Sequence, residues 1–242
     1  MAAVEKTVLK TTLREECLPA LARAAPYFSL ADVRAWLKRR RLPALPATLR
    51  RYLHEALADS LIHDAGRGWY SPIKELFVLN REPVRELVTS LHKRFPLLDF
   101  SCWSTEQVAS YGHHQLARFV VFVHTERDAM ESTANALRDA GWSAWLNPTR
   151  QEATKSYRSE DRTVVVRPAV SRAPAQAGFA AIEKILVDLR VEADALKFFD
   201  QGEYRRLVAN LAGRNRIAVG ALAAYARRRG VGLDAVLGEL IN

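Results

Sequence analysis

The segment Gly66-Arg67-Gly68 separates two short runs of strand-forming residues and follows three amphipathic segments. The flanking runs are Leu61–His63 and Trp69–Ser71, which are rich in aromatic and β-branched side chains. Glycine adopts backbone conformations that a tight turn needs and that other residues avoid. The segment therefore predicts a β-hairpin, which constrains how the residues before it can fold.

Three helices are expected before this hairpin. Apolar residues recur at helical spacing over residues 12–23, from Ser29 to about Arg41, and over residues 47–59. Ser29 and Asp32 have the spacing of a capping box at the start of the second helix. The order of helix, helix, basic helix and glycine hairpin is typical of a winged helix-turn-helix. We expect this domain over residues 1–74, and a connecting helix or linker over residues 75–96.

A larger domain is expected over residues 97–242. Its predicted strands are residues 97–103, 118–125, 143–146 and 163–170, and helical patterns continue from Phe179 to the end. The fold class predicted for the chain is α+β: an N-terminal winged helix-turn-helix, then a domain with a small β-sheet and a helical C-terminal half.

The distribution of charge suggests a polyanionic partner. The formal net charge is +9, and residues 34–51 contain seven basic residues and no acidic one. Clustered Lys and Arg bind nucleic acid by neutralising phosphates and releasing counterions. The expected partner is double-stranded DNA, although a solvated basic face on a helical domain remains an alternative.

The expected DNA-binding residues lie on the third helix, in the turn before it and in the hairpin. Side chains near the start of a recognition helix read base edges, whereas flanking cations hold phosphates. The base-reading candidates are Thr48, Arg50, Arg51 and His54. The phosphate-contacting candidates are Lys38, Arg39, Arg40 and Arg41, with Arg67 directed toward a minor groove and Tyr70 beside it.

A second basic surface is predicted near the C-terminus, where residues 204–233 contain seven arginines and no acidic residue. Such a surface could extend the DNA footprint or contact an acidic protein. Cations at a helix end explain only the last three arginines. The residues are Arg205, Arg206, Arg214, Arg216, Arg227, Arg228 and Arg229.

The sequence contains no convincing pattern of catalytic or metal-binding residues. Cys17 and Cys102 are far apart in the sequence and are expected to be buried thiols, and no metal or cofactor is predicted. Glu183 and Asp188 could belong to a magnesium-dependent nuclease. Their segment instead favours a packed helix that carries surface charges, so we do not expect an enzyme.

Cellular location is predicted from two features. No apolar stretch is long enough to cross a bilayer, and residues 1–10 carry charges where a secretory signal has its apolar segment. A cytoplasmic location without membrane association is expected.

Three stretches of the chain form a familiar combination: residues 48–53 continuing through 66–71, residues 100–105 followed by 118–123, and residues 181–189. Together they resemble the AbiEi-type antitoxins of type IV toxin–antitoxin systems. The resemblance implies that the winged helix represses the protein's own operon and that the C-terminal domain acts as an antitoxin in phage abortive infection. It also implies functional antagonism of a nucleotidyltransferase-like toxin without a stable complex.

Two other functions remain open. The chain could be a winged-helix transcription factor whose C-terminal domain senses a ligand or dimerises, or a DNA-targeted nuclease or nucleotidyltransferase-like enzyme. A nucleotidyltransferase-like reading frame beside the gene would favour the antitoxin.

Overall fold

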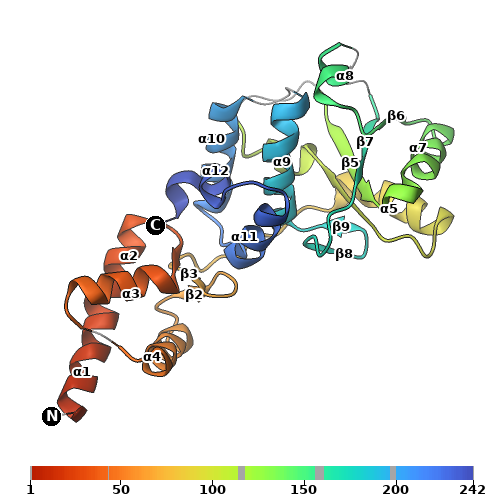
Figure 1. The fold of residues 1–242 in the computed structure, drawn as a ribbon. Coiled ribbons are helices and arrows are strands. Elements are labelled where there is room, and N and C mark those ends of the chain that lie inside the picture. Colours follow the sequence, from red (N-terminus) through yellow and green to blue (C-terminus); the bar gives the residue numbers. More distant parts are fainter. Residues whose placement is uncertain (1, 43, 114–117, 156–160, 197–199, 242) are drawn as a thin grey trace. The chain divides into compact units, whose positions relative to one another are not determined.

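A computed structural model describes residues 2–42, 44–113, 118–155, 161–196 and 200–241, which form two compact units (Figure 1). The fold is α+β, with a helical C-terminal half, as the sequence predicts. The first unit comprises Met1–Phe77, Ala212–Ala221 and Leu237–Asn242, and the second comprises Val78–Leu211 and Leu222–Val236.

The first unit combines helices with a small antiparallel sheet in the order β1-β3-β2. Its N-terminal helices are α1 (Ala2–Thr12), a π-helical turn (Leu13–Cys17), α2 (Leu18–Ala24), α3 (Leu30–Arg39) and α4 (Pro46–Ala58). Its strands are β1 (Phe28–Ser29), β2 (His63–Asp64) and β3 (Trp69–Ser71). Helices and sheet share one core, in which Cys17, Phe28 and Leu53 are almost completely buried.

The first helical stretch is longer than predicted, since it begins at Ala2 instead of near Thr12. The π-helical turn that interrupts it precedes Pro19, which lies in the first turn of α2. Proline has no backbone N–H to donate, so the regular hydrogen-bond pattern of an α-helix cannot run through this position.

The second unit is built on a six-stranded sheet in the order β6-β7-β5-β4-β9-β8. Its strands are β4 (Phe100–Ser104), β5 (Val120–Thr125), β6 (Ser143–Leu146), β7 (Thr163–Pro168), β8 (Ala175–Gln176) and β9 (Phe179–Ala180). Its N-terminal and central helices are α5 (Glu82–Arg94), α6 (Glu106–Ala109), α7 (Met130–Asp139) and α8 (Arg150–Lys155). The later helices are α9 (Ile182–Leu196), α10 (Gln201–Ala212), α11 (Val219–Arg228) and α12 (Leu233–Leu237). Ala212, residues 219–221 of α11 and Leu237 are counted with the first unit.

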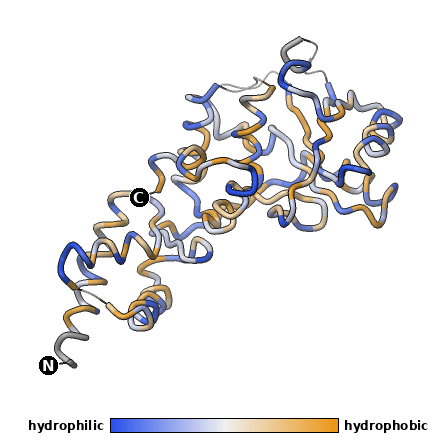
Figure 2. Tube along the Cα trace, viewed as in Figure 1, coloured by the Kyte–Doolittle hydropathy of each residue, from blue (hydrophilic) through white to orange (hydrophobic). Residues whose placement is uncertain are grey.

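Successive side chains of the central strands point to opposite faces of this sheet. On one face, Val121 and Val164 pack with apolar residues of α5 and α7. On the other face, His124 and Arg167 approach acidic side chains of α9, and Figure 1 shows α9 on the side opposite α7. The tube in Figure 2 is strongly hydrophobic along β5 and β7, as expected for strands that are covered on both faces.

The units differ from the predicted domains in two places. The segment expected to link the domains forms α5, whose buried residues, including Leu87 and Leu91, pack on the sheet of the second unit. The C-terminal segments 212–221 and 237–242 instead belong to the first unit. An apolar helix face that has a sheet to cover becomes part of that core, and sequence periodicity does not reveal which sheet it covers.

All four strands predicted for the second unit are present as β4 to β7; β6 has the predicted bounds, and the ends of the other three are shifted by a few residues. β8 and β9 were not predicted, because strands of two residues are too short to show alternation. Both cysteines are free and buried, as predicted, and burial raises the pKa of the Cys17 thiol to about 12.

Candidate functional site

Helix α3 has a defined cap at each end. At the start of α3, the backbone N–H of Asp32 donates to the Ser29 hydroxyl and the backbone N–H of Ser29 donates to the Asp32 carboxylate, which confirms the predicted capping box. At its end, the N–H of Leu42 bonds to the carbonyl of Leu37 and the N–H of Arg41 bonds to that of Lys38. This Schellman motif places Arg41 at a φ of 57°, a position that favours glycine.

Helix α4 has one buried face and one exposed basic face. Leu49, Leu53 and Ala56 are at most 1% exposed and anchor the helix to the core. The predicted base-reading residues Arg50, Arg51 and His54 are exposed, and Thr48 is half-buried. The 3.6-residue period separates these two sets, so anchoring the helix leaves its basic side chains accessible.

Two of the basic side chains form contacts with acidic and aromatic residues of the same unit. Arg51 lies 3.8 Å from Glu55 and its guanidinium lies over Tyr52. Arg40 forms a 2.8 Å ion pair with Glu16 and lies over Trp36. These contacts partly neutralise and orient both arginines.

Several other candidates carry free charge. In the described part of the chain, no acidic side chain pairs with Lys38, Arg39, Arg41, Arg50 or Arg67, and all five side chains are exposed. Cations without an intramolecular partner are the ones that can neutralise phosphates with full effect.

The hairpin between β2 and β3 turns at Gly66 and Gly68, which have φ values of 91° and 78°. Arg67 is exposed between them, as predicted for the tip. Tyr70 on β3 is half-buried; burial and nearby Asp64 raise the pKa of its hydroxyl, and Arg50 opposes this shift. Tyr70 packs against the same core as Leu49 and Leu53 of α4, so the basic helix and the hairpin adjoin each other.

A returning C-terminal segment supports the hairpin, a feature that the sequence analysis missed. The N–H of Gly220 donates to the carbonyl of Ala65 at 3.1 Å. A Cβ atom on Gly220 would lie 2.6 Å from the backbone nitrogen of Arg67, so only glycine fits there. Contacts between residues about 150 positions apart leave no periodic signal in a sequence.

Two further side chains bind this segment to the first unit. The Tyr27 hydroxyl accepts a hydrogen bond from the N–H of Ile217 at 3.1 Å and lies 2.9 Å from the carbonyl oxygen of Ala212. Arg216 donates to the carbonyls of Ile73 and Lys74 at 3.0 and 3.1 Å. Arg216 therefore binds the backbone just after β3.

The seven C-terminal arginines do not form the single exposed surface that was expected. Arg214 and Arg216 belong to the first unit, and the other five belong to the second. Arg205, Arg206, Arg214, Arg227 and Arg228 are exposed. Arg216 is half-buried against backbone carbonyls, and the Arg229 side chain is only 15% exposed and faces acidic residues. A run without acids in the sequence can still be neutralised by acids from elsewhere in the fold.

A buried charged cluster in the second unit centres on Asp188, which is fully buried. The Tyr225 hydroxyl donates to its Oδ1 at 2.8 Å, and Arg229 Nε lies 3.1 Å from the same oxygen. Lys184 Nζ contacts Oδ2, and His124 Nε2 lies 3.5 Å from it. Four donor-bearing side chains thus surround one carboxylate.

The cluster continues to Glu192, one helical turn further along α9. Arg167 Nη2 donates to Glu192 Oε2 at 2.6 Å, and its Nε lies 3.1 Å from both carboxylate oxygens. Arg167 Nη1 also donates to the Pro148 carbonyl at 2.7 Å and to Asn147 Oδ1 at 3.2 Å. Arg229 Nη2 lies 3.6 Å from Glu192, so it joins the two carboxylates.

This cluster contradicts the prediction of surface charges on the helix that contains Asp188. Lys184, Asp188 and Glu192 are 1%, 0% and 2% exposed. Burial lowers the pKa of His124 well below its usual value, and Lys184 adds to this effect, so the ring is neutral near pH 7. Burial opposes ionisation of Asp188, but Lys184 and the other cations hold the pKa of Asp188 below its usual value.

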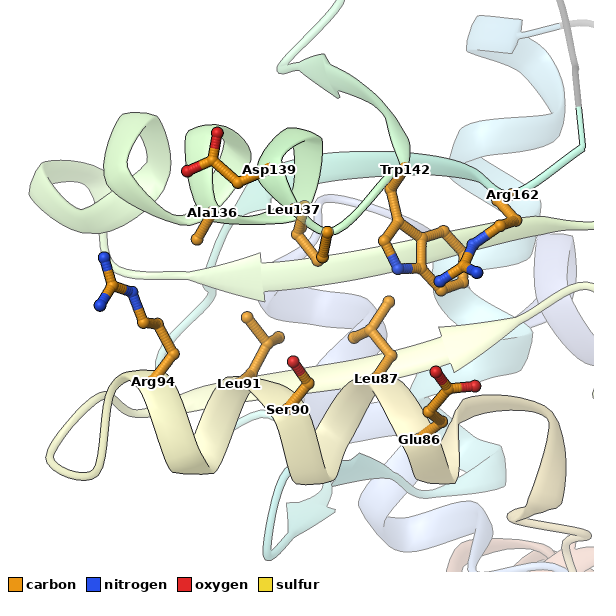
Figure 3. Close-up of a pocket in the computed structure, with 11 residues that line it drawn as sticks. Glu86, Leu87, Ser90, Leu91, Arg94, Ala136, Leu137, Asp139, Trp142 and Arg162 are labelled. Atoms are coloured by element: carbon orange, nitrogen blue, oxygen red, sulfur yellow. The ribbon is translucent and has the colours of Figure 1, made fainter.

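A pocket with a volume of about 430 Å³ lies between α5 and α7 (Figure 3). Leu87, Leu91 and Leu137 line its apolar part. Arg94 lies at one end and Arg162 at the other, where the Arg162 guanidinium is 4.8 Å from the Trp142 ring centroid. This pocket was not predicted from the sequence, because its walls come from separate helices.

Among the described residues, no group of three or more His, Cys, Asp or Glu side chains is placed to hold a metal ion. No described helix combines the length and apolar character needed to cross a bilayer.

The protein is therefore an α+β protein of two units. The first is rich in helices and carries an exposed basic helix, and the second contains a mixed β-sheet. Residues 48–237 match the model of a family of unknown function, DUF6577, and the chain belongs to that family. No curated protein matches the chain. The family match begins at the first turns of α4 and includes the hairpin, the charged cluster and α11.

Proposed function

We propose that the chain is a DNA-binding transcriptional repressor whose first unit acts as a winged helix-turn-helix. The observation that carries this proposal is the exposed basic face of α4 beside the hairpin that bears Arg67. A helix of this kind fits the major groove, and a hairpin arginine can reach an adjacent minor groove. The cations of the turn before α4 would then hold the backbone phosphates.

The roles proposed for the individual basic residues depend on whether an acidic side chain of the protein already pairs with them. Arg50 and His54 are exposed and form the base-reading pair. Lys38, Arg39 and Arg41 contact phosphates, because they have no acidic partner in the described residues. Arg40 and Arg51 contribute less, since part of their charge is already satisfied within the unit.

We further propose that the second unit provides an antitoxin activity against a nucleotidyltransferase-like toxin. The resemblance of three stretches to AbiEi-type antitoxins supports this part of the proposal. Co-expression with a toxin encoded beside the gene should restore growth, and the two proteins should not co-purify. Failure to restore growth would leave a repressor without antitoxin activity.

Gel-shift titration against the protein's own promoter tests DNA recognition. Replacing Arg50 and His54 by alanine should reduce discrimination between the promoter and unrelated DNA by about tenfold or more, because good base contacts contribute about 1–3 kcal/mol each. The matched control replaces Arg85 and Arg138, two exposed basic residues of the second unit, by alanine. Unchanged discrimination in the Arg50 and His54 variant would refute the recognition assignment.

A further inference from the structure

The strongest unexplained feature lies at the carboxyl ends of three parallel strands in the second unit. Strands β5 and β7 are in register with His124 opposite Arg167, and β6 pairs Leu146 with Val166. All three strands therefore end at the same edge of the sheet. In open sheets with parallel strands, ligands bind outside the carboxyl ends, where loops can diverge and present polar groups.

Three separate segments carry arginines near this edge. Arg167 is the penultimate residue of β7, and Arg229 directly follows α11. Arg228 Nη2 donates to the carbonyl oxygen of Arg172 at 2.6 Å, which joins the end of α11 to the loop after β7. We call Arg167, Arg172, Arg228 and Arg229 the carboxyl-edge arginines.

The buried part of this edge has more positive than negative groups. Three cationic side chains face the carboxylates of Asp188 and Glu192, namely Arg167, Lys184 and Arg229. Both ring nitrogens of buried His124 lack a hydrogen-bond partner among the described residues. The neutral His124 ring carries one N–H, so it leaves one donor unsatisfied. Buried charge is costly unless it is paired, so an excess cation with an unsatisfied donor nearby favours a bound anion.

The outer part of the edge is accessible. Arg172 and Arg228 are exposed, and neither pairs with an acidic side chain in the described part of the chain. The Arg167 and Arg229 side chains are 11% and 15% exposed, so they can be reached from outside but are recessed. Guanidinium groups bind phosphate through paired, charge-assisted hydrogen bonds.

We propose that the carboxyl-edge arginines bind the terminal phosphate group of a small phosphorylated ligand, such as a nucleotide. A terminal phosphate can reach recessed guanidinium groups, whereas the diester backbone of a DNA duplex can touch only the exposed Arg172 and Arg228. The site lies wholly within the second unit and does not depend on the DNA-binding proposal. It gives the second unit the means to respond to a small molecule.

The test is calorimetric titration of the full chain with AMP, with inorganic phosphate and with adenosine. AMP and inorganic phosphate should bind, and adenosine should not. Replacing Arg172 and Arg228 by glutamine should weaken binding of both phosphate probes by about tenfold or more, since hydrogen bonds to charged groups contribute about 1.5–3 kcal/mol each. These residues are exposed, so the variant should fold like the parent, and a thermal unfolding scan checks this.

The matched control replaces Arg205 and Arg206 by glutamine, which makes the same change in net charge on exposed residues of the second unit. It should bind both probes within about twofold of the parent. The proposal is overturned if neither probe binds the parent, or if the Arg172 and Arg228 variant binds like the parent. It is also overturned if that variant weakens binding of duplex DNA alone. None of these results affects the promoter test, in which the substitutions are in α4.

Discussion

Helices α4 and α9 both carry ionisable residues four positions apart, yet those of α4 are exposed and those of α9 are buried. Arg50 and His54 of α4 are exposed. Lys184 and Asp188 of α9 are buried and paired with each other. The difference arises from the rest of each helix: α4 is apolar on one side only, whereas the first turns of α9 are buried all round. Charge spacing alone therefore does not distinguish a binding face from an internal network.

The two arrangements also predict different consequences of mutation. Removing an exposed cation changes binding and leaves stability almost unchanged. Removing one partner of a buried ion pair leaves the other charge without compensation and destabilises the fold.

Replacing Asp188 by alanine should have the largest effect on stability. The substitution leaves Lys184 and Arg229 without their shared carboxylate, and breaking a buried pair in this way costs about 3–5 kcal/mol. Urea unfolding followed by circular dichroism measures the change. Glu131→Ala, at an exposed position of α7, is the control and should change stability by less than about 0.5 kcal/mol. Equal stability of the two variants would contradict an internal network.

Replacing Gly220 by alanine should destabilise the first unit by about 1–3 kcal/mol, because the new methyl group overlaps the backbone of the Arg67 turn. Gly202→Ala provides the control, since its methyl group would meet only the Asp200 carboxylate at 3.2 Å. Thermal unfolding and promoter binding should both weaken for Gly220→Ala alone. A Gly220→Ala protein with parental stability and binding would mean that the C-terminal segment does not support the hairpin.

Acidification should destabilise the second unit. The pKa of His124 is lowered in the folded state, chiefly by burial and then by Lys184. Its contribution to stability is therefore complete above the unfolded-state pKa of about 6.5 and is lost as the pH falls below it, by up to about 1.4 kcal/mol per pH unit.

Urea unfolding of the parent and of His124→Gln at pH 7.5, 6.0 and 5.0 checks this pH dependence. The variant should lose less stability than the parent over this range, because glutamine does not titrate. Parallel pH profiles would show that His124 is not responsible.

Replacing Arg41 by glycine should have two small and opposite consequences, a gain in stability and a loss of DNA affinity. Glycine relieves the left-handed backbone conformation and should stabilise the first unit by about 1 kcal/mol. Loss of the cation should nevertheless weaken DNA binding severalfold. Ser60→Gly is the control, since Ser60 has the same φ of 57° and carries no charge. It should stabilise the unit without changing DNA binding, and weakened binding in both variants would point to the backbone instead of the charge.

The local elements of the first unit were the easiest to predict from the sequence. The Ser29 capping box, the position of β3 and the hairpin glycines depend on residues a few positions apart. The exposed face of α4 was predictable for the same reason, since helical periodicity separates Arg50 and His54 from the buried Leu49 and Leu53.

Long-range features were not predictable from local patterns. The contact of Gly220 with the hairpin joins distant segments, and each of these segments is unremarkable in the sequence. The charges of α9 were expected at the surface because their compensating partners, Arg167 and Arg229, lie on other elements. A charged side chain can be buried when other elements supply its counter-charge, and only the fold shows that they do.

If the free cations before α4 bind phosphates, promoter binding must depend on salt through them. Each phosphate contact contributes about 0.9 to the slope of log K against log salt. Replacing Lys38 and Arg39 by alanine should therefore lower the magnitude of that slope by about 1.8, from the same relation. The Arg85 and Arg138 double variant should keep the parental slope. Equal slopes for all three proteins would contradict the account.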